Sequence, residues 1–167
     1  NGNINVSLET ILKIAQALQV EISELFNINL ENSPKPFVKW AGGKTQLLQK
    51  ITTFLPETFN TYIEPFLGGG ALFFHLLPKN TIINDKNQEL FLAYTCFQDL
   101  KKFNELTAKL KEHEQKHTDE YYYEIRKLDR SPEFNKMTCA ERAARLIYLN
   151  KACFNGLYRV NKAGYFN

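Results

Sequence analysis

The feature that most constrains the fold is a run of three glycines, Gly68–Gly70, placed between an apolar strand and a helix. Residues 61–64 have the length and side chains of a buried strand, and residues 71–77 follow with helical spacing. Residues 81–84 form a second short apolar run. This order of strand, glycine loop, helix and strand predicts a βαβ unit, and hence an α/β fold with a parallel, Rossmann-like sheet.

Weaker patterns organise the rest of the chain. Helical spacing recurs outside this unit, at residues 8–18, 44–54 and 88–154, with a break in the last stretch near Pro132. Residues 155–167 are rich in Asn and Gly and predict an irregular loop or hairpin. We therefore expect four parts: a small helical piece at 1–28, a linker at 29–36, an α/β part at 37–86 and a helical region at 87–167.

Composition argues against several classes of protein. No stretch approaches the roughly 20 apolar residues of a membrane span, and the first residues lack the basic and apolar regions of a signal peptide. The three cysteines are odd in number and show no Cys-x-x-Cys spacing, which favours a reducing compartment and argues against a zinc site. These patterns predict a cytoplasmic protein without a bound metal.

Charge is distributed unevenly along the chain. Residues 1–33 hold four Glu and one Lys, whereas residues 142–167 hold five basic residues and no acidic one. A basic and aromatic-rich segment suits a polyanion such as nucleic acid. The alternative is a solvated face with scattered ion pairs, and charge alone leaves the two interpretations even.

A second glycine loop, Gly42-Gly43-Lys44-Thr45, imitates the end of a phosphate-binding P-loop. A P-loop requires another glycine five residues before Gly43, and that position is Val38. No convincing buried strand precedes the loop. An NTPase is therefore excluded.

The Gly68–Gly70 loop fits a different ligand. A dinucleotide fingerprint needs a third glycine spaced after Gly70, and none is present. Glu64 ends the first expected strand, and Asp85 ends the second, where its carboxylate can accept hydrogen bonds from two ribose hydroxyls. Two strand-end acids around a glycine turn suit an adenosine ligand without a pyrophosphate, such as S-adenosylmethionine, although a purely structural turn is the alternative.

Four motifs in order resemble those of the DNA adenine methylase (Dam, D12 class) family of N6-adenine DNA methyltransferases. They are Phe37-Val38-Lys39-Trp40-Ala41-Gly42-Gly43-Lys44, Tyr62-Ile63-Glu64-Pro65-Phe66-Leu67-Gly68-Gly69-Gly70, Asn84-Asp85 with Asn87, and Asn155-Gly156-Leu157-Tyr158-Arg159-Val160-Asn161. The resemblance covers residues 36–167. It implies a partial S-adenosylmethionine-dependent methyltransferase core with a helical DNA-recognition insertion.

The resemblance also implies roles for single residues in binding S-adenosylmethionine. Trp40 and Lys44 would line the donor pocket, with Lys44 near the methionine carboxylate, and Asp85 would hold the ribose. Glu64 would sit by the amino-acid end of the donor or only brace the loop. The alternatives are purely structural: Trp40 would be a residue of the hydrophobic core, and Lys44 would be a helix-start residue exposed to water. The full candidate donor set is Trp40, Lys44, Glu64, Phe66, Gly68, Gly70 and Asp85.

A second set is implied for double-stranded DNA. Phe154 would fill the gap left by an extruded adenine, with a helix-end core residue as the alternative. Arg159 is the candidate for a bidentate contact to a guanine edge, and Lys151 and Lys162 for phosphate contacts. The full set is Lys151, Phe154, Asn155, Leu157, Arg159, Asn161 and Lys162. GATC is a hypothesis for the target.

The tetrapeptide with which this family holds the adenine amine, (Asp or Asn)-Pro-Pro-aromatic, is missing, because no two of the six prolines are adjacent. We therefore expect an inactive fragment of a longer adenine-specific methyltransferase. The alternative is a DNA-binding regulator that keeps a non-catalytic methylase fold. A cytosine-C5 enzyme is disfavoured, because none of the cysteines follows a proline.

The first residues carry a separate resemblance. Residues 6–26 resemble the second half of a Cro/repressor-type helix-turn-helix, whose recognition helix would lie upstream. A generic amphipathic helix pair is the alternative. The sequence thus predicts a small all-α remnant ahead of the α/β part.

Overall fold

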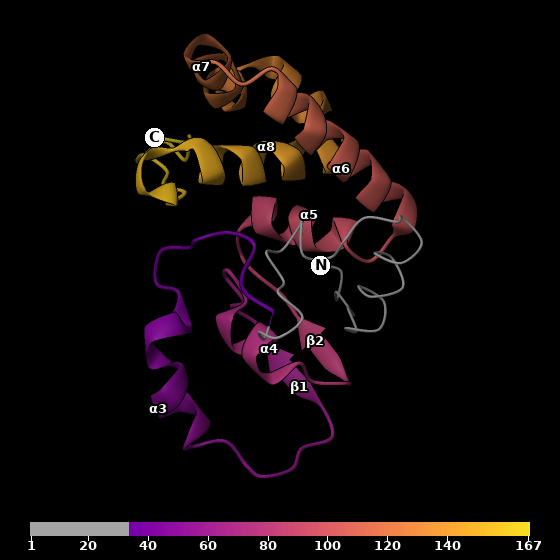
Figure 1. Ribbon diagram of the computed structural model, residues 1–167, viewed down its shortest axis with the longest axis vertical. Coiled ribbons are helices and arrows are strands. Elements are labelled where there is room, and N and C mark those ends of the chain that lie inside the picture. Colours follow the sequence, from indigo (N-terminus) through magenta and orange to yellow (C-terminus); the bar gives the residue numbers. More distant parts are fainter. Residues whose placement is uncertain (1–33) are drawn as a thin grey trace.

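The computed structural model describes residues 34–167, which form two layers (Figure 1). One layer holds the strands with α3 and α4, and the other holds the helices from α5 to α8. The helix-turn-helix remnant at 1–28 and most of the linker lie outside the described residues. Among residues 34–167, no helix combines the length and the apolar character needed to cross a membrane.

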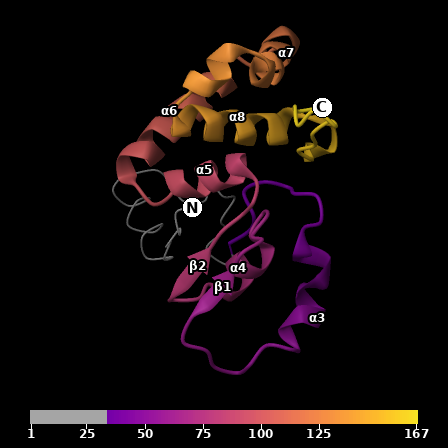
Figure 2. The same ribbon diagram turned by 180° about the vertical axis from the view of Figure 1, so that it is seen from behind.

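The two strands form the βαβ unit that the glycine loop predicts. Strand β1 (Tyr62–Glu64) and strand β2 (Thr81–Ile83) pair in parallel, with Tyr62 opposite Thr81. Helix α4 (Ala71–Leu76) makes the crossover between them, as seen from behind in Figure 2. The expected α/β class with parallel strands is confirmed. One face of the sheet is covered, with Ile83 at 0% exposure, and the other is open, with Ile63 at 63%.

Helix α8 is the centre of the helical layer. It spans Cys139–Ala152 and packs against both α5 (Gln88–Cys96) and α6 (Leu100–Gln115). Three alanines of α8 are buried at these contacts, and small side chains let neighbouring helices approach closely: Ala140, Ala143 and Ala144. Helix α7 (Asp119–Lys127) lies at the far end of this layer (Figure 1).

The helical region has more breaks than the sequence pattern predicts. Besides the expected break, at the 3-10 turns η2 (Leu128–Arg130) and η3 (Pro132–Lys136), the chain leaves the helix before α6 and before α7. Asp99 caps α6 by accepting from Lys102 N–H, and Thr118 caps α7. Short polar side chains satisfy the free N–H groups at a helix start, and this offsets the cost of each interruption.

Residues 44–54 differ in part from the single amphipathic helix that their spacing predicts. A 3-10 turn, η1 (Lys44–Leu47), leads into a short α3 (Leu48–Thr52), and neither contains a buried residue. Leu47 is 53% exposed and Phe54 78%. The apolar side of this segment therefore has little packing to lengthen it into a regular helix.

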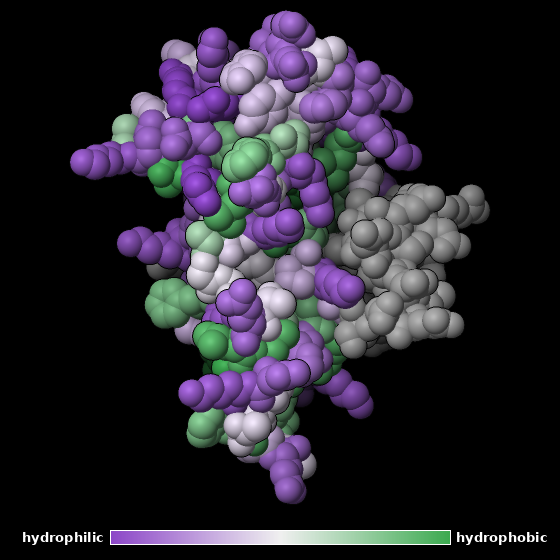
Figure 3. Space-filling model, turned by 60° about the vertical axis from the view of Figure 1, so that its left-hand side comes forward, coloured by the Kyte–Doolittle hydropathy of each residue, from purple (hydrophilic) through white to green (hydrophobic). Residues whose placement is uncertain are grey.

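Two irregular segments complete the fold. Near the start, the Phe37 ring packs edge-on against Tyr94 of α5, with ring centroids 5.1 Å apart. At the other end, the turn η4 (Phe154–Gly156) follows α8, and Val160 pairs with Phe166 in an antiparallel bridge. The expected loop or hairpin at 155–167 is thus a short hairpin. On the face in Figure 3, hydrophilic side chains project from both layers, with smaller hydrophobic patches between them.

Candidate functional site

Asp85 joins the end of the second strand to the glycine loop. Its Oδ2 accepts a hydrogen bond from Gly68 N–H at 2.7 Å, and its Oδ1 accepts one from Asn87 N–H at 2.8 Å. A carboxylate oxygen has two acceptor positions, so each oxygen can accept one further hydrogen bond. The side chain is half-buried, and a ligand with hydroxyl groups can use the remaining positions.

Glu64 is the buried acid at the end of β1, with an exposure of 6%. Its Oε2 accepts a hydrogen bond from the Tyr62 hydroxyl at 2.5 Å, and its Oε1 lies 2.8 Å from Lys44 Nζ. Burial raises the pKa of Tyr62 above its ordinary value of 10, and the hydrogen bond and charge of Glu64 raise it further. Glu64 is therefore held at this corner of the fold by contacts with Tyr62 and Lys44.

Lys44 is held by the same corner. Besides the ion pair with Glu64, its Nζ donates a hydrogen bond to the Phe66 carbonyl at 2.8 Å. The contacts tie the start of η1 to the loop after β1. Lys44 is the first residue of η1 and its side chain is 33% exposed, but these two contacts hold its ammonium group against the loop.

A hollow of about 730 Å³ opens at the carboxyl ends of both strands. This size lies in the range of about 300–1,000 Å³ typical of small-molecule sites. Glu64, Phe66 and Asp85 line it, whereas the four other donor candidates do not: Trp40, Lys44, Gly68 and Gly70. Phe66 is 71% exposed, so its ring is available as an apolar wall.

Glu64 and Asp85 also affect the pKa of a neighbouring tyrosine, Tyr94. Tyr94 is buried, and its hydroxyl donates to the Gly68 carbonyl at 3.3 Å. Burial raises the pKa of Tyr94 well above 10, and the negative charges of Glu64 and Asp85 add to the rise. The strand ends therefore bring two carboxylates together, and Lys44 offsets the charge of one of them, Glu64.

The glycine loop is fixed by its neighbours as much as by its own backbone. Gly70 has φ +78°, and a Cβ there would lie 2.7 Å from the Tyr94 hydroxyl oxygen. A Cβ on Gly69 would lie 2.9 Å from the Val38 carbonyl oxygen. Both approaches are too close for a side chain, so any residue other than glycine at these positions requires the neighbouring atoms to shift.

Trp40 connects the start of the α/β part to the loop after α8. Its ring stacks on Tyr158, with centroids 5.4 Å apart and planes 15° from parallel. It is partly buried against the core, which is the bland interpretation of a lone Trp. The stack gives it a second role, because it joins two of the motifs. Tyr158 was not singled out by the sequence pattern.

Phe154 projects into solvent at the end of α8. Its exposure of 91% contradicts the alternative of a helix-end core residue. Asn155 follows with φ 59°, a left-handed conformation that asparagine tolerates better than most residues, and Gly156 continues it with φ 64°. The Asn-Gly pair therefore makes a tight turn that leaves Phe154 free.

The candidate DNA residues are brought together on one end of the helical layer. Three basic side chains there are exposed: Lys151, Arg159 and Lys162. Leu157 has a structural role, because it pairs with Lys39 in a parallel bridge. Asn161 also has one, since its Oδ1 accepts hydrogen bonds from Ala163 N–H at 2.9 Å and Tyr165 N–H at 3.1 Å.

A second hollow, of about 480 Å³, lies between this loop and α7. Phe154 and Arg159 line one side, and Tyr122, Tyr123 and Arg126 of α7 line the other. Arg126 also lies over the Tyr123 ring, 5.8 Å from its centroid. Sequence reasoning missed these α7 residues, although a tyrosine run followed by arginine was the available signal.

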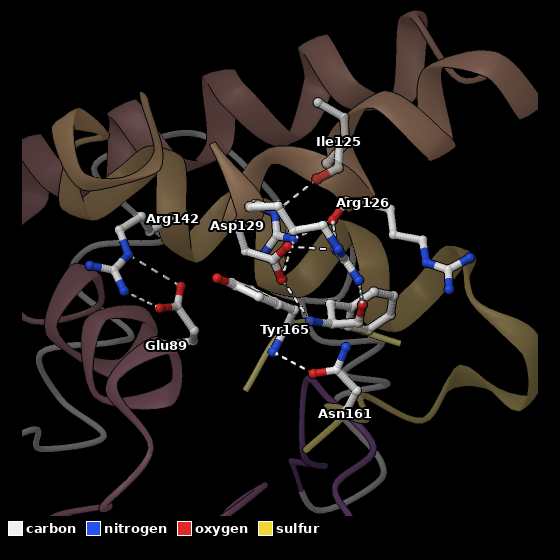
Figure 4. Close-up of polar contacts among 10 residues, drawn as sticks. Glu89, Ile125, Arg126, Asp129, Arg142, Asn161 and Tyr165 are labelled. Atoms are coloured by element: carbon white, nitrogen blue, oxygen red, sulfur yellow. Dashed lines mark hydrogen bonds and ion pairs between the residues drawn. The ribbon is translucent and has the colours of Figure 1, made fainter. Parts of the chain in front are cut away.

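A buried ion pair holds the end of the chain against this region (Figure 4). Arg145, 1% exposed, donates to the Ile125 and Arg126 carbonyls at 2.8 Å each and lies 3.0 Å from Asp129 Oδ2. The same Asp129 oxygen accepts from Phe166 N–H at 2.6 Å. The hairpin is therefore anchored to α7 and α8 through one carboxylate.

The structure thus has a hollow at the carboxyl ends of two parallel strands, where open α/β sheets bind ligands, and a separate loop with exposed basic side chains. The sequence model of the D12 class N6 adenine-specific DNA methyltransferase family matches residues 40–167. Because this match covers more than half of the chain, the protein belongs to that family.

Relatives agree with this assignment. The chain is 46% identical over 133 residues to the type II methyltransferase M1.LlaDCHI of Lactococcus lactis subsp. cremoris, covering 80% of this chain and 46% of that protein. It is 43% identical over 151 residues to the type II methyltransferase M.MjaIII of Methanocaldococcus jannaschii, covering 80% and 50%. It is 34% identical over 135 residues to the DNA adenine methylase of Haemophilus influenzae, covering 80% and 46%.

The chain thus spans about half the length of these relatives. The other sequence-based hypothesis, a DNA-binding regulator, gains no support from their names. Within residues 34–167, no three histidine, cysteine, aspartate or glutamate side chains gather as a metal ion would require.

Proposed function

We propose that the protein is an adenine-specific DNA methyltransferase that transfers a methyl group from S-adenosylmethionine to adenine N6 in duplex DNA. The observation that carries this proposal is the family match over residues 40–167, which contains both the acidic strand ends and the basic loop. We assign residues 37–86 to donor binding, on a Rossmann-like core, and residues 87–167 to target recognition. The cytoplasm is the expected location.

The donor site follows from the acidic corner. S-adenosylmethionine, when bound, supplies an electrophilic methyl group on a positively charged sulfur. Asp85 accepts hydrogen bonds from the ribose hydroxyls through its remaining acceptor positions, and its negative charge favours the cation. Lys44 orders the loop that carries Phe66, whose ring provides an apolar wall. Trp40 packs against the glycine loop at Gly68, and Gly70 lets the loop approach Tyr94 closely.

The DNA site follows from the exposed loop. Phe154 is free to fill the space that an extruded base leaves in the stack. Arg159 is placed to read a guanine edge, and Lys151 and Lys162 to bind phosphates. Arg126, across the second hollow, adds a positive charge that the sequence reasoning missed.

Donor binding is tested by titration calorimetry of the chain with S-adenosylmethionine. Asp85→Ala removes the carboxylate that accepts the ribose hydroxyls. A hydrogen bond to a charged group contributes about 1.5–3 kcal/mol, so we expect Kd to rise at least about tenfold. Asp99→Asn is the matched control, because Asn caps a helix as well as Asp and Asp99 lies at the start of α6. Equal affinity of Asp85→Ala and wild type would contradict the assignment.

Methyl transfer is expected to need a catalytic tetrapeptide. No two prolines of the 167 residues are adjacent, so the (Asp or Asn)-Pro-Pro-aromatic group is not in this chain. We therefore predict that the purified chain binds the donor but transfers no methyl group. The check is transfer of tritium from labelled donor to duplex DNA, with a complete adenine methylase as positive control, and any transfer above background would overturn the prediction.

The target sequence is tested separately. GATC is the working hypothesis, carried over from relatives with the Asn-Gly-Leu-x-Arg pattern. DNA from cells that express the full-length protein would be digested with enzymes sensitive to adenine methylation. Unprotected GATC sites would end the hypothesis without affecting the donor assignment.

A further inference from the structure

Asn150 is a buried side chain whose amide pairs with the backbone of a distant segment. It lies near the end of α8 and is 1% exposed. Its Oδ1 accepts a hydrogen bond from Lys39 N–H at 3.0 Å, and its Nδ2 donates one to the Lys39 carbonyl at 2.7 Å. One amide therefore satisfies both backbone polar groups of Lys39, as a strand neighbour would.

The surroundings of Asn150 join the two candidate sites. Lys39 precedes Trp40 of the donor motif and forms a parallel bridge with Leu157 of the recognition loop. The residues that follow Lys39 and Leu157 are also in contact, because Trp40 stacks on Tyr158. A Cβ on Gly156 would lie 3.3 Å from the Asn150 carbonyl, so the loop also passes close to α8 at this point. The Asn150 clamp, defined as its two hydrogen bonds to Lys39, thus lies where α8, the donor motif and the recognition loop meet.

Packing alone does not explain an asparagine at this position. Burying an amide is costly unless its hydrogen-bonding groups are satisfied, and a leucine would fill the same space without that cost. Among residues 34–167, the segment around Lys39 pairs with other backbone through one isolated bridge, so the N–H and carbonyl of Lys39 itself need a partner. The Asn150 amide supplies both hydrogen bonds, and it thereby fixes the position of the segment around Lys39 relative to α8.

We propose that Asn150 is a positioning residue that couples donor binding to DNA binding. By holding Lys39, it sets Trp40 against Tyr158, so that ordering the donor motif and ordering the recognition loop are one event. This inference rests on the proposed function and deepens it. Coupling between two binding sites is reciprocal, so the donor strengthens DNA binding by the factor by which DNA strengthens donor binding.

Two variants remove the clamp in different ways. Asn150→Asp keeps the size and the acceptor for Lys39 N–H but sets a second oxygen against the Lys39 carbonyl. Asn150→Ala removes both hydrogen bonds and is favourable in a helix, so it carries the test if the first variant fails to fold. Leu106→Ala is the matched control, because Leu106 is fully buried between helices and lies in α6, away from Lys39.

The first readout needs no ligand. Trp40 is the only tryptophan, so fluorescence excited selectively at the indole reports on the environment of Trp40, which includes its stack with Tyr158. We expect both Asn150 variants to shift the emission of Trp40 toward that of a solvated indole. We expect Leu106→Ala to leave the emission of Trp40 unchanged. The variants are compared at temperatures equally far below the midpoint of thermal unfolding of each. A general loss of stability would change the emission of all three variants alike.

The second readout is the coupling itself. The Kd of S-adenosylmethionine would be measured with and without a saturating short duplex that contains GATC, and again with one that lacks it. We expect the wild type and Leu106→Ala to bind the donor at least about fivefold more tightly with DNA present, and both Asn150 variants to show a ratio near one.

The outcomes separate this inference from the proposed function. If the wild type binds both ligands and the Asn150 variants keep the wild-type ratio and Trp40 emission, the positioning role is wrong and the function stands. If the wild type binds neither ligand, the proposed function and the coupling both fail. A wild type that binds both ligands with a ratio of one overturns the coupling alone.

Discussion

Single residues in this protein acquire their chemistry from contacts that lie far away in the sequence. Cys96 at the end of α5 and Cys139 at the start of α8 place their sulfur atoms 3.3 Å apart. The hydrogen bond with Cys96 lowers the pKa of Cys139 to about 7, and nearby positive charges of Lys102 and Arg142 support this. The same contact and burial raise the pKa of Cys96. The contact therefore favours the thiolate on Cys139 over the thiolate on Cys96.

We predict selective alkylation of Cys139. Its rate with iodoacetamide should rise through a midpoint near pH 7, because the thiolate is the reactive form. Cys153, whose pKa burial raises, should lag at neutral pH. Mass spectrometry of peptides from samples quenched across a pH series gives the rates. Cys96→Ala removes the main cause, so the Cys139 midpoint should move toward its ordinary value of 9. An unmoved midpoint would contradict the role of Cys96.

At the same scale, the candidate site was only partly predictable. Asp85 and Glu64 follow from strand ends and motif spacing, since both belong to one local unit of chain. The Asn150 clamp does not, because its partner lies 111 residues away and no local pattern marks that pairing. Tyr158 likewise appeared only as part of a motif, and its stack with Trp40 required the fold.

Among the elements, α8 depends on its first turn. Thr138 accepts a hydrogen bond from Glu141 N–H at 3.2 Å, and the Glu141 side chain accepts one from Thr138 N–H at 2.9 Å. This reciprocal capping box satisfies two of the free N–H groups at the helix start. Because α8 packs against both α5 and α6, we expect a change that destabilises α8 to destabilise the helical layer as well.

We predict that Thr138→Ala lowers the free energy of unfolding by about 1 kcal/mol, the usual effect of losing an N-cap. Urea unfolding at pH 7 measures it. Thr107→Ala in the middle of α6 is the control and should be near neutral, because Thr107 only donates back to the Asn104 carbonyl. A similar loss in both variants would mean that the box contributes nothing specific.

The capping box also has a pH signature. The hydrogen bond from Thr138 N–H lowers the pKa of Glu141 below its ordinary value of 4.5. The stabilisation is therefore fully present above about pH 4.5 and is lost as the pH falls through the lowered folded-state pKa. The gap in stability between wild type and Glu141→Gln, whose side chain cannot ionise, should narrow in that acidic range.

The sequence predicts the kinds of element better than their ends. The βαβ unit follows from glycine, proline and apolar spacing, and the structure contains it. The breaks before α6 and α7 were missed, because Asp99 and Thr118 interrupt stretches whose apolar spacing continues past them. A cap is a single polar side chain, and it carries less signal in the sequence than a repeated apolar face.

For the molecule as a whole, the last residues are bound through Asp129. This carboxylate meets Arg145, Arg130 and the Phe166 N–H, and the Arg130 guanidinium also donates to the Phe166 carbonyl at 2.7 Å. The side chain of Arg145 is 1% exposed and that of Asp129 is 8% exposed. Because water has little access to either charge, each one is stabilised mainly by the other. The hairpin with Arg159 and Lys162 is placed by this network.

We predict that Asp129→Ala is strongly destabilising. Removing one partner of a buried pair leaves a charge uncompensated, at a cost of about 3–5 kcal/mol. Urea unfolding measures the loss, and limited trypsin digestion should cut after Lys162 much faster than in the wild type. Asp119→Ala, an exposed position at the start of α7, should resist trypsin as the wild type does. Unchanged cleavage at Lys162 would show that the network does not hold the hairpin.

The close approach between Gly69 and Val38 bears on how such chains can vary. Gly69 is glycine because the backbone of a segment 31 positions earlier lies 2.9 Å from where its Cβ would be. An alanine inherited at position 69 would therefore be tolerated only together with a shift of the segment around Val38. Asn150 also holds that segment, through its two hydrogen bonds to Lys39. We therefore expect substitutions at Gly69, at Val38 and at Asn150 to occur together in related sequences.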